Sequence, residues 1–309
     1  AASMANHLET VCHAGPFGMD LHPDLKGLPY VVCVTDDDKG GKSRVVVTTL
    51  SEGHRLASSY FANFKGKGKK RQQVAFLMNG DKPTESLFGD VLRNEFGIID
   101  LDSKSHPLPD DWWNVFSSIF KYDPNSLVHG ILFPSLGIKI PRALSAQMDA
   151  FGATRVTSSG VKFDKLGKTT SGQPIFPKDE EIAKEIIATF VIDLTLIRSF
   201  GNGEKGLTDP QKQFLVAFAL WKITQLLQNP FRFRSGCDLE FQCLCINGNE
   251  TSEKLPAIQM ENYIKSAKFK ASNINPVTRV YWPSSSLFTD ESDDGNDARD
   301  ETEEDEQDS

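Results

Sequence analysis

The stretch that decides the fold reads DPNSLVHGILFPSLGIKIPRALSAQMDAFGATRVTSSGVKFD and covers residues 123–164. After an opening turn, the apolar run 127–133 has the length and composition of a buried strand. Pro141 suits the first position of a helix, and apolar side chains then recur at helical spacing up to Gly152. Residues 155–164 predict a returning strand with a bend at 158–160. The stretch therefore predicts a strand, helix, strand unit in an α+β protein.

The remaining apolar patterns predict further elements on both sides of this unit. Strands are expected at 30–34, 44–50, 73–77 and 238–246, and helices at 52–64, 86–96, 110–122 and 208–228. For 180–200 we expect a helix that continues as a strand, and for 165–178 a long loop.

Composition places the chain among soluble globular proteins. Of its 309 residues 39% are hydrophobic and 25% charged, and no apolar run reaches the roughly 18 residues that a membrane span needs. Residues 1–6 are typical of an expression scar and start, and no basic segment leads into an apolar core as in a secretory signal. We expect a cytoplasmic protein without a membrane partner.

Charge is distributed unevenly. Residues 287–309 hold twelve acids against Arg299 alone, a net charge of −11, whereas the preceding residues hold 30 acids and 33 bases, a net charge of +3. Residues 287–309 are therefore predicted to form a disordered acidic tail on a mildly basic body.

The chain offers no arrangement for catalysis or metal binding. Its five cysteines lack paired zinc spacing, and Cys243 and Cys245 alternate with apolar residues as in a buried strand. His129 lies in an apolar run, which favours a hydrogen-bonded core histidine over a catalytic base. We expect no catalytic residue, no metal and no cofactor.

Two glycine-rich motifs resemble nucleotide-binding loops but have the wrong context. The motif ending in Gly41-Lys42-Ser43 has Asp36 where a P-loop needs glycine, and a predicted strand follows it. The G-x-G-x-x-G match at 201–206 precedes the helix cap at Thr208, so a turn is favoured. ATP binding at 41–43 stays a weaker alternative.

Binding chemistry is easier to find, because cations gather in three places. Arg142 would lie on the first turn of the predicted helix, where free amides already favour anions. Residues 65–71 hold five cations and two glycines, and Arg232 and Arg234 flank Phe233 in an extended segment. Together they predict a surface that follows a nucleic-acid backbone without reading bases.

Five short blocks carry a resemblance to a known family. They are EGHRLAS (52–58), SLVHG (126–130), PRALSA (141–146), VTSSGV (156–161) and RSGCDL (234–239). In this order they resemble the repeated backbone subunit of the type I-G (formerly I-U) CRISPR Cascade.

The resemblance implies a ferredoxin-like, RNA-recognition-type palm over 7–286 with insertions called fingers and a thumb. Copies would line up along CRISPR RNA (crRNA), hold its backbone and leave its bases free to pair with target DNA beside other Cascade subunits. The expected RNA-binding residues are His54, Arg55, Lys65, Lys67, Lys69, Lys70, Arg71, Lys139, Arg142, Ser145, Lys162, Lys165, Arg232 and Arg234.

Related subunits of type III systems suggest an alternative. They cut target RNA with a thumb-loop aspartate, and Asp164 lies beside a loop that could be the thumb. A metal-dependent RNA-cleaving subunit is therefore the second hypothesis, and a non-catalytic subunit is the first.

Overall fold

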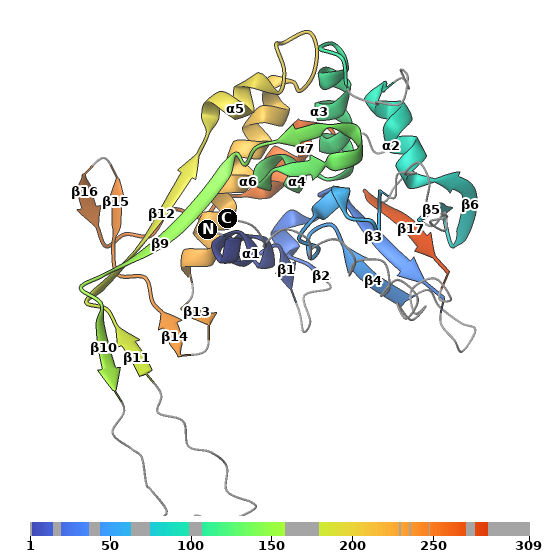
Figure 1. Ribbon diagram of the computed structural model, residues 1–309. Coiled ribbons are helices and arrows are strands. Elements are labelled where there is room, and N and C mark those ends of the chain that lie inside the picture. The colour runs from blue at the N-terminus through green and yellow to red at the C-terminus, as the bar shows by residue number, and fades with distance from the viewer. Residues whose placement is uncertain are drawn as a thin grey trace, which may run out of the picture.

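The fold follows from a computed structural model of the chain (Figure 1). It describes residues 2–14, 20–36, 44–62, 75–98, 107–157, 179–228, 230–234, 236–246, 248–269 and 276–283. Several expectations fall outside these residues: the basic segment 65–71, the motif 41–43, the segment 165–178, the tail 287–309, and Lys162, Asp164 and Lys165.

The described residues form a mixed α and β structure, which confirms the general class expected from the sequence. Seven α-helices occur among them: α1 (Ala2–Thr10), α2 (Phe88–Phe96), α3 (Asp111–Tyr122), α4 (Pro124–His129), α5 (Leu194–Ser199), α6 (Asp209–Gln228) and α7 (Met260–Ala267). Short 3-10 helices lie at η2 (Pro23–Leu25), η3 (Arg55–Ala57) and η4 (Pro134–Leu136). No helix in the described ranges is long and apolar enough to cross a membrane.

The largest sheet has five strands in the order β4-β3-β17-β5-β6. Its members are β3 (Tyr30–Thr35), β4 (Arg44–Thr48), β5 (Phe76–Asn79), β6 (Lys82–Leu87) and β17 (Val277–Trp282). The central strands β3 and β17 run parallel, and every other neighbouring pair is antiparallel. The last described strand, β17, thus pairs with β3, which lies near the start of the chain.

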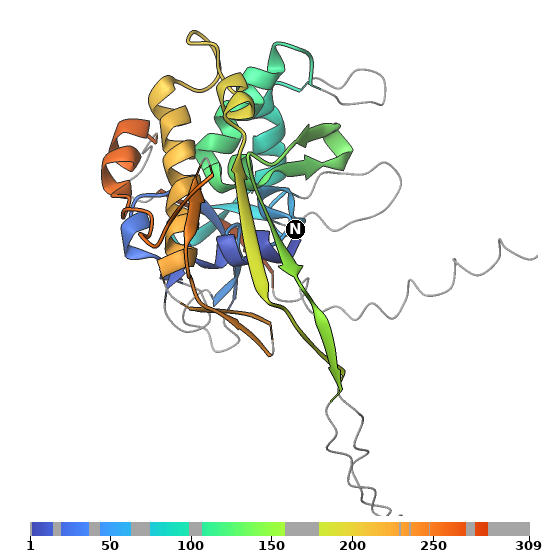
Figure 2. The same ribbon diagram turned by 90° about the vertical axis from the view of Figure 1, so that its left-hand side faces the viewer.

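A long two-stranded arm projects from the opposite side of the body (Figures 1 and 2). Its shaft is the antiparallel pair β9 (Leu144–Phe151) and β12 (Glu185–Ile192), and its outer part is β10 (Thr154–Thr157) with β11 (Asp179–Ile182). The alternating residues Leu144, Ala146, Phe190 and Ile192 turn one face of the shaft toward the core.

Smaller hairpins complete the chain. They are β1 (His13–Ala14) with β2 (Asp20–Leu21), β7 (Ile131–Phe133) with β8 (Ile138–Ile140), β13 (Phe231–Arg234) with β14 (Cys237–Leu239), and β15 (Leu244–Ile246) with β16 (Asn249–Thr251).

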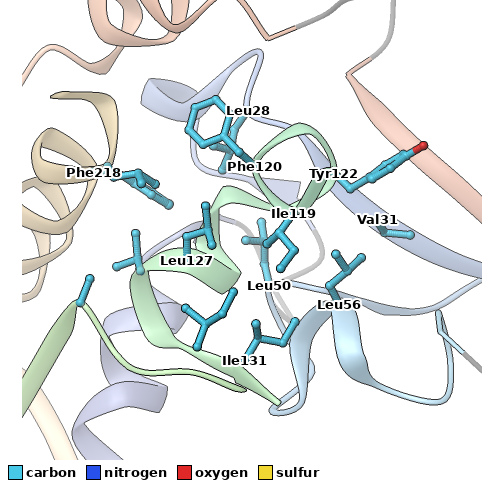
Figure 3. Packing of buried hydrophobic residues seen from close by; sticks show 14 of the residues in the cluster. Leu28, Val31, Leu50, Leu56, Ile119, Phe120, Tyr122, Leu127, Ile131 and Phe218 are labelled. Atoms are coloured by element: carbon cyan, nitrogen blue, oxygen red, sulfur yellow. The ribbon is translucent and has the colours of Figure 1, made fainter. Parts of the chain in front are cut away.

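One continuous apolar core lies between the five-stranded sheet and the arm. Figure 3 shows side chains from β3, α3, α4, β7 and α6 meeting in it, among them Val31, Ile119, Leu127, Ile131 and Phe218. Because α6 packs against α1, α4, α5, α7 and the base of the arm, it is buried on most of its surface.

Several elements confirm the sequence predictions. Strands β3 and β4 and helices α2, α3 and α6 fall where the periodicity placed them, and β5 overlaps its predicted segment. At the start of α6, Thr208 N donates to Gln211 Oε1, which is half of the predicted capping box. Gly201 and Gly206 face each other across a tight turn, as expected for a motif that is not a nucleotide loop.

The stretch 123–164, in contrast, differs in structure from the prediction. The segment 127–133 is not one strand, because Pro124 starts the helix α4 and Gly130, at a positive φ of 80°, ends it before β7. The helix predicted from Pro141 is wrong, since residues from Leu144 onward form strand β9 of the arm. The spacing of Leu144 and Met148 is compatible with a helix and with a strand, and pairing with β12 favours the strand. Of the predicted returning strand, β10 covers the described beginning.

Three further predictions are corrected. The helix expected at 52–64 is reduced to turns and η3, and at 180–200 the order is reversed, with strands β11 and β12 before helix α5. The strand expected at 238–246 is divided between two hairpins. Cys243 and Cys245 are therefore exposed rather than buried.

Leucines on neighbouring elements test the position of this core. Leu127 of α4 is fully buried, whereas Leu132 of β7 is 54% exposed. We expect Leu127→Ala to lower the free energy of unfolding by about 2–5 kcal/mol, because it leaves a cavity. The matched control Leu132→Ala should change it by less than about 0.5 kcal/mol. Urea denaturation measures both, and equal losses would contradict the described packing.

Candidate nucleic-acid interface

A buried ion pair between Arg55 and Glu9 lies where the blocks 52–58 and 126–130 contact each other. The Arg55 guanidinium donates through Nε to Glu9 Oε1 at 2.6 Å and through Nη2 to Glu9 Oε2 at 2.9 Å. Its third donor, Nη1, reaches the Gly130 carbonyl at 3.0 Å. Both charged residues are more than nine-tenths buried. The guanidinium therefore links α1, η3 and the turn after α4 through charge-assisted bonds.

A second set of buried polar groups continues from Glu9. Asn125 donates to Glu9 Oε1 at 2.9 Å and accepts a hydrogen bond from Lys222 Nζ. Lys222, which is fully buried in α6, also lies 3.0 Å from His129 Nε2 and 4.5 Å from the centre of the Phe218 ring. These contacts tie α6 to α4, so the network joins four segments distant in the sequence.

His129 is a buried, hydrogen-bonded core histidine, as the sequence predicted. Burial lowers its pKa well below the usual value, and the nearby cations Lys222, Arg55 and Arg142 lower it further. A neutral ring can accept a hydrogen bond from Lys222 Nζ at Nε2. Its Nδ1 is buried and has no hydrogen-bond partner among the residues that the structure describes.

The structure corrects the role expected for Arg55. This residue was expected on the RNA-facing surface, but its side chain is buried and its donors are directed at Glu9 and Gly130. The reason is that η3 turns Arg55 inward beside α4, where Leu56 N also donates to Ser126 Oγ at 3.5 Å. The blocks 52–58 and 126–130 thus meet through their buried side chains.

Polar side chains of the same blocks lie on the surface above this network. His54, next to Arg55, has a side chain that is 85% exposed. A Cβ added to Gly130 would lie 3.1 Å from both Cγ and N of Arg142, so Arg142 lies close to Gly130, whose carbonyl oxygen accepts a hydrogen bond from Arg55. Strand β7 contacts η3 and pairs with β8, on which Lys139 is exposed. Exposed His54, Lys139 and Arg142 therefore lie on segments that are close to one another near the base of the arm, and exposed Ser145 follows on β9.

Arg142 does not lie at a helix terminus. The expected anion site at amides of a helix starting at Pro141 is therefore wrong, because these residues lead into a strand. The side chain of Arg142 is exposed, so its own charge remains available to a phosphate.

The other predicted cations lie elsewhere. Arg232 is on the hairpin β13–β14 and forms an exposed ion pair with Asp238 at 2.8 Å. That hairpin packs against α1, where His7 Nε2 lies 3.2 Å from the Phe233 carbonyl oxygen. The side chain of Arg234 lies outside the described part of the structure, as do Lys65, Lys67, Lys69, Lys70, Arg71, Lys162 and Lys165.

Sequence reasoning missed the arm that forms one border of this surface. Its signal was present in 185–192, where Ile186, Ala188, Phe190 and Ile192 alternate with residues of the other face. It also missed Glu9, Asn125 and Lys222, whose joint burial depends on contacts across more than 90 residues.

The chain is a mixed α and β protein, and the exposed basic side chains near the base of its projecting arm form the candidate interface. Residues 1–155, just over half of the chain, match the family described as CRISPR-associated protein GSU0053, and the chain belongs to this family. The matched part includes the blocks 52–58, 126–130 and 141–146. No curated protein matches the chain.

The buried ion pair gives a stability prediction. Arg55→Met leaves the Glu9 carboxylate buried without its partner, so we expect a loss of about 3–5 kcal/mol in the free energy of unfolding. The double variant with Glu9→Met removes both charges and should recover part of this loss. His54→Met, at the exposed neighbouring position, is the control and should change stability by less than about 0.5 kcal/mol. A loss no larger for Arg55→Met than for His54→Met would contradict the network.

Asp123 gives a prediction for pH. Burial raises the pKa of its carboxyl to about 7, although a hydrogen bond from Ser126 and the charges of Arg55 and Lys222 act in the opposite direction. Glu9 adds a further upward effect on this pKa. Because the folded state holds this proton more tightly than the unfolded state, the group favours folding at acidic pH, and this contribution is lost as the pH rises toward 7.

We therefore expect the stability of the wild type to fall relative to Asp123→Asn between about pH 4 and pH 7, at a rate of up to about 1.4 kcal/mol per pH unit. The lowered pKa of His129 affects the stability of both proteins, so its effect cancels in the difference between their free energies of unfolding. Thermal unfolding of both proteins across this range measures the effect. A difference that stays constant with pH would show that Asp123 does not titrate in this way.

Proposed function

We propose that this chain is a non-catalytic backbone subunit of a type I CRISPR effector (Cascade) complex of subtype I-G. In this role several copies bind along one crRNA in the cytoplasm, hold its phosphate backbone, and leave its bases free to pair with target DNA. Sequence is then read by base pairing, and the protein needs only to recognise the backbone. The other Cascade subunits would bind the ends and flanks of this filament.

The observation that carries the proposal is the position of His54, Lys139 and Arg142. Lys139 and Arg142 are neighbours in the sequence, and the Arg55–Gly130 bond and the contact of η3 with β7 bring the segment of His54 close to theirs. Exposed cations on a rigid base can position phosphates without reading bases. Membership of a CRISPR-associated family makes crRNA the natural ligand for such a surface.

The architecture supports the same role. A central parallel pair with antiparallel neighbours, as in β3 and β17, is compatible with a ferredoxin-like palm. The arm β9–β12 corresponds in this proposal to the thumb, whose outer end would separate bases of the guide at intervals.

Co-expression with a CRISPR array tests the proposal. We expect the protein to purify with RNA in a particle containing several copies, and its affinity for RNA to fall steeply with added salt. Purification of RNA-free monomer from that co-expression would contradict the proposal.

Charge reversal then tests the surface itself. Lys139→Glu and Arg142→Glu should each weaken RNA binding. Each should also make the negative slope of log K against log salt shallower, by about 0.7 for each phosphate that the protein no longer neutralises. Lys82→Glu, on the edge strand β6, is the matched control and should leave the slope unchanged. Filter binding with a labelled guide measures all three variants. Wild-type slopes for the two surface variants would remove these residues from the interface.

A further inference from the structure

The acidic tail, residues 287–309, has a charge complementary to that of the surface near the base of the arm. It holds twelve acids and one base, a net charge of −11. Because an extended chain advances about 3.4 Å per residue, an extended tail would carry one carboxylate roughly every 6.5 Å. A surface that attracts phosphates by charge alone also attracts such a row of carboxylates.

Lys139 and Arg142 are cations that such a tail can reach without displacing another acid. Both side chains are exposed, and neither forms an ion pair within the part of the chain that the structure describes. Arg232, in contrast, is already paired with Asp238 at 2.8 Å. A carboxylate that approaches Lys139 or Arg142 therefore gains a partner in a place where these cations otherwise face water.

The strands of the arm, in contrast, are unfavourable for an acidic segment. Together with the link between β11 and β12, the described strands hold five acids and two bases, a net charge of −3. Like charges repel, so a polyanion is favoured at the base of the arm and disfavoured along its strands.

The described chain ends close to the segment that carries His54. Strand β17 lies between β3 and β5 (Figure 1), and its last residue, Trp282, donates through Nε1 to the Tyr60 carbonyl oxygen at 2.9 Å. The rings of Tyr60 and Trp282 also contact each other, with centroids 5.7 Å apart. Six residues separate His54 from Tyr60, so the two lie within about 20 Å of each other.

The length of chain after β17 is sufficient for the acids to reach these cations in the same copy. Asp290, the first acid of the tail, follows Trp282 by eight residues, which span up to about 27 Å, and residues 283–309 span up to about 90 Å. The contact of η3 with β7 brings the segment of His54 close to that of Lys139 and Arg142. A tail that starts beside Tyr60 can therefore extend over the whole surface.

We propose that the acidic tail binds the exposed cations Lys139 and Arg142 of its own copy and competes there with RNA. A competitor on the same chain acts at an effective concentration in the millimolar range, so it suppresses weak contacts with any RNA that passes. A guide held by several copies at once binds more tightly and displaces the tails. This inference rests on the proposed function and adds the regulation of the same surface.

Neutralisation of the tail in the full chain tests the competition. Each acid of 287–309 is replaced by its amide, Asp→Asn or Glu→Gln, which keeps the length of the tail. We expect the affinity for a short RNA to rise about tenfold at low salt, and the difference from the wild type to narrow as salt screens the charges. A tail with the same residues in scrambled order is the control and should act like the wild type. Equal affinities of the neutralised variant and the wild type in filter binding would overturn the inference.

A double-mutant cycle locates the contact. In a protein with Lys139→Glu and Arg142→Glu, neutralisation of the tail should change the affinity for RNA by less than about twofold, because the tail no longer binds there. In a protein with Lys82→Glu, on the exposed edge strand β6, the tenfold effect should persist. A tenfold effect in both backgrounds would show that the acids repel RNA from another place, which would overturn the assignment to Lys139 and Arg142.

Carbodiimide cross-linking without RNA tests the contact independently of the proposed function. The reagent joins a lysine amine to a carboxylate that touches it, so we expect links from Lys139 to acids of the tail and none from Lys82. Addition of guide RNA should remove these links. In a mixture of isotopically labelled and unlabelled protein the links should join residues of one copy, and links between labelled and unlabelled copies would overturn the assignment to the same copy.

The two proposals fail in different ways. A wild type that binds no RNA, even with its tail neutralised, would contradict the proposed function. RNA binding by the wild type, with no links from Lys139 to the tail and no gain on neutralisation, would overturn the competition by the tail and leave the proposed function intact.

Discussion

The ion pair between Arg55 and Glu9 constrains the rest of the molecule, because two buried charges must satisfy each other away from water. Burial of unpaired charges is strongly unfavourable, so only arrangements that bring α1 and η3 together are allowed. The bond to the Gly130 carbonyl adds the turn after α4, and Asn125 and Lys222 extend the same constraint to α6. A polar network therefore fixes the relative positions of segments that apolar packing alone would hold less specifically.

This constraint also explains how the surface is divided. Gly130 can lie against Ile140 and Arg142 only because it has no side chain: an added Cβ would lie 2.9 Å from the Ile140 carbonyl oxygen and 3.1 Å from Arg142 N. The base of the arm thereby receives exposed cations from neighbouring segments, while the strands of the arm are acidic and apolar. The base of the arm and the strands of the arm thus differ in chemical character.

The sequence predicted the regular elements better than the site. Helix α6 and strand β3 carry unambiguous periods, so local pattern and tertiary structure agree. Leu144 and Met148 fit a helix and a strand equally well, and the distant strand β12 decides between them. Arg55 shows the same limit for the site, since nothing local reveals that its partner is Glu9, 46 residues earlier. Lys139 and Arg142 were found as cations, but the approach of the His54 segment to them depends on the contact between η3 and β7.

In the proposed function, RNA contacts the base of the arm and not the distant surface around Leu194 and Tyr263, which line a pocket between α5, α6 and α7. Ultraviolet cross-linking of the protein purified with its guide, followed by mass spectrometry of the cross-linked peptides, tests this claim most directly. We expect cross-links in the peptides that contain His54, Lys139 and Arg142. Cross-links concentrated instead at Leu194 and Tyr263 would contradict it.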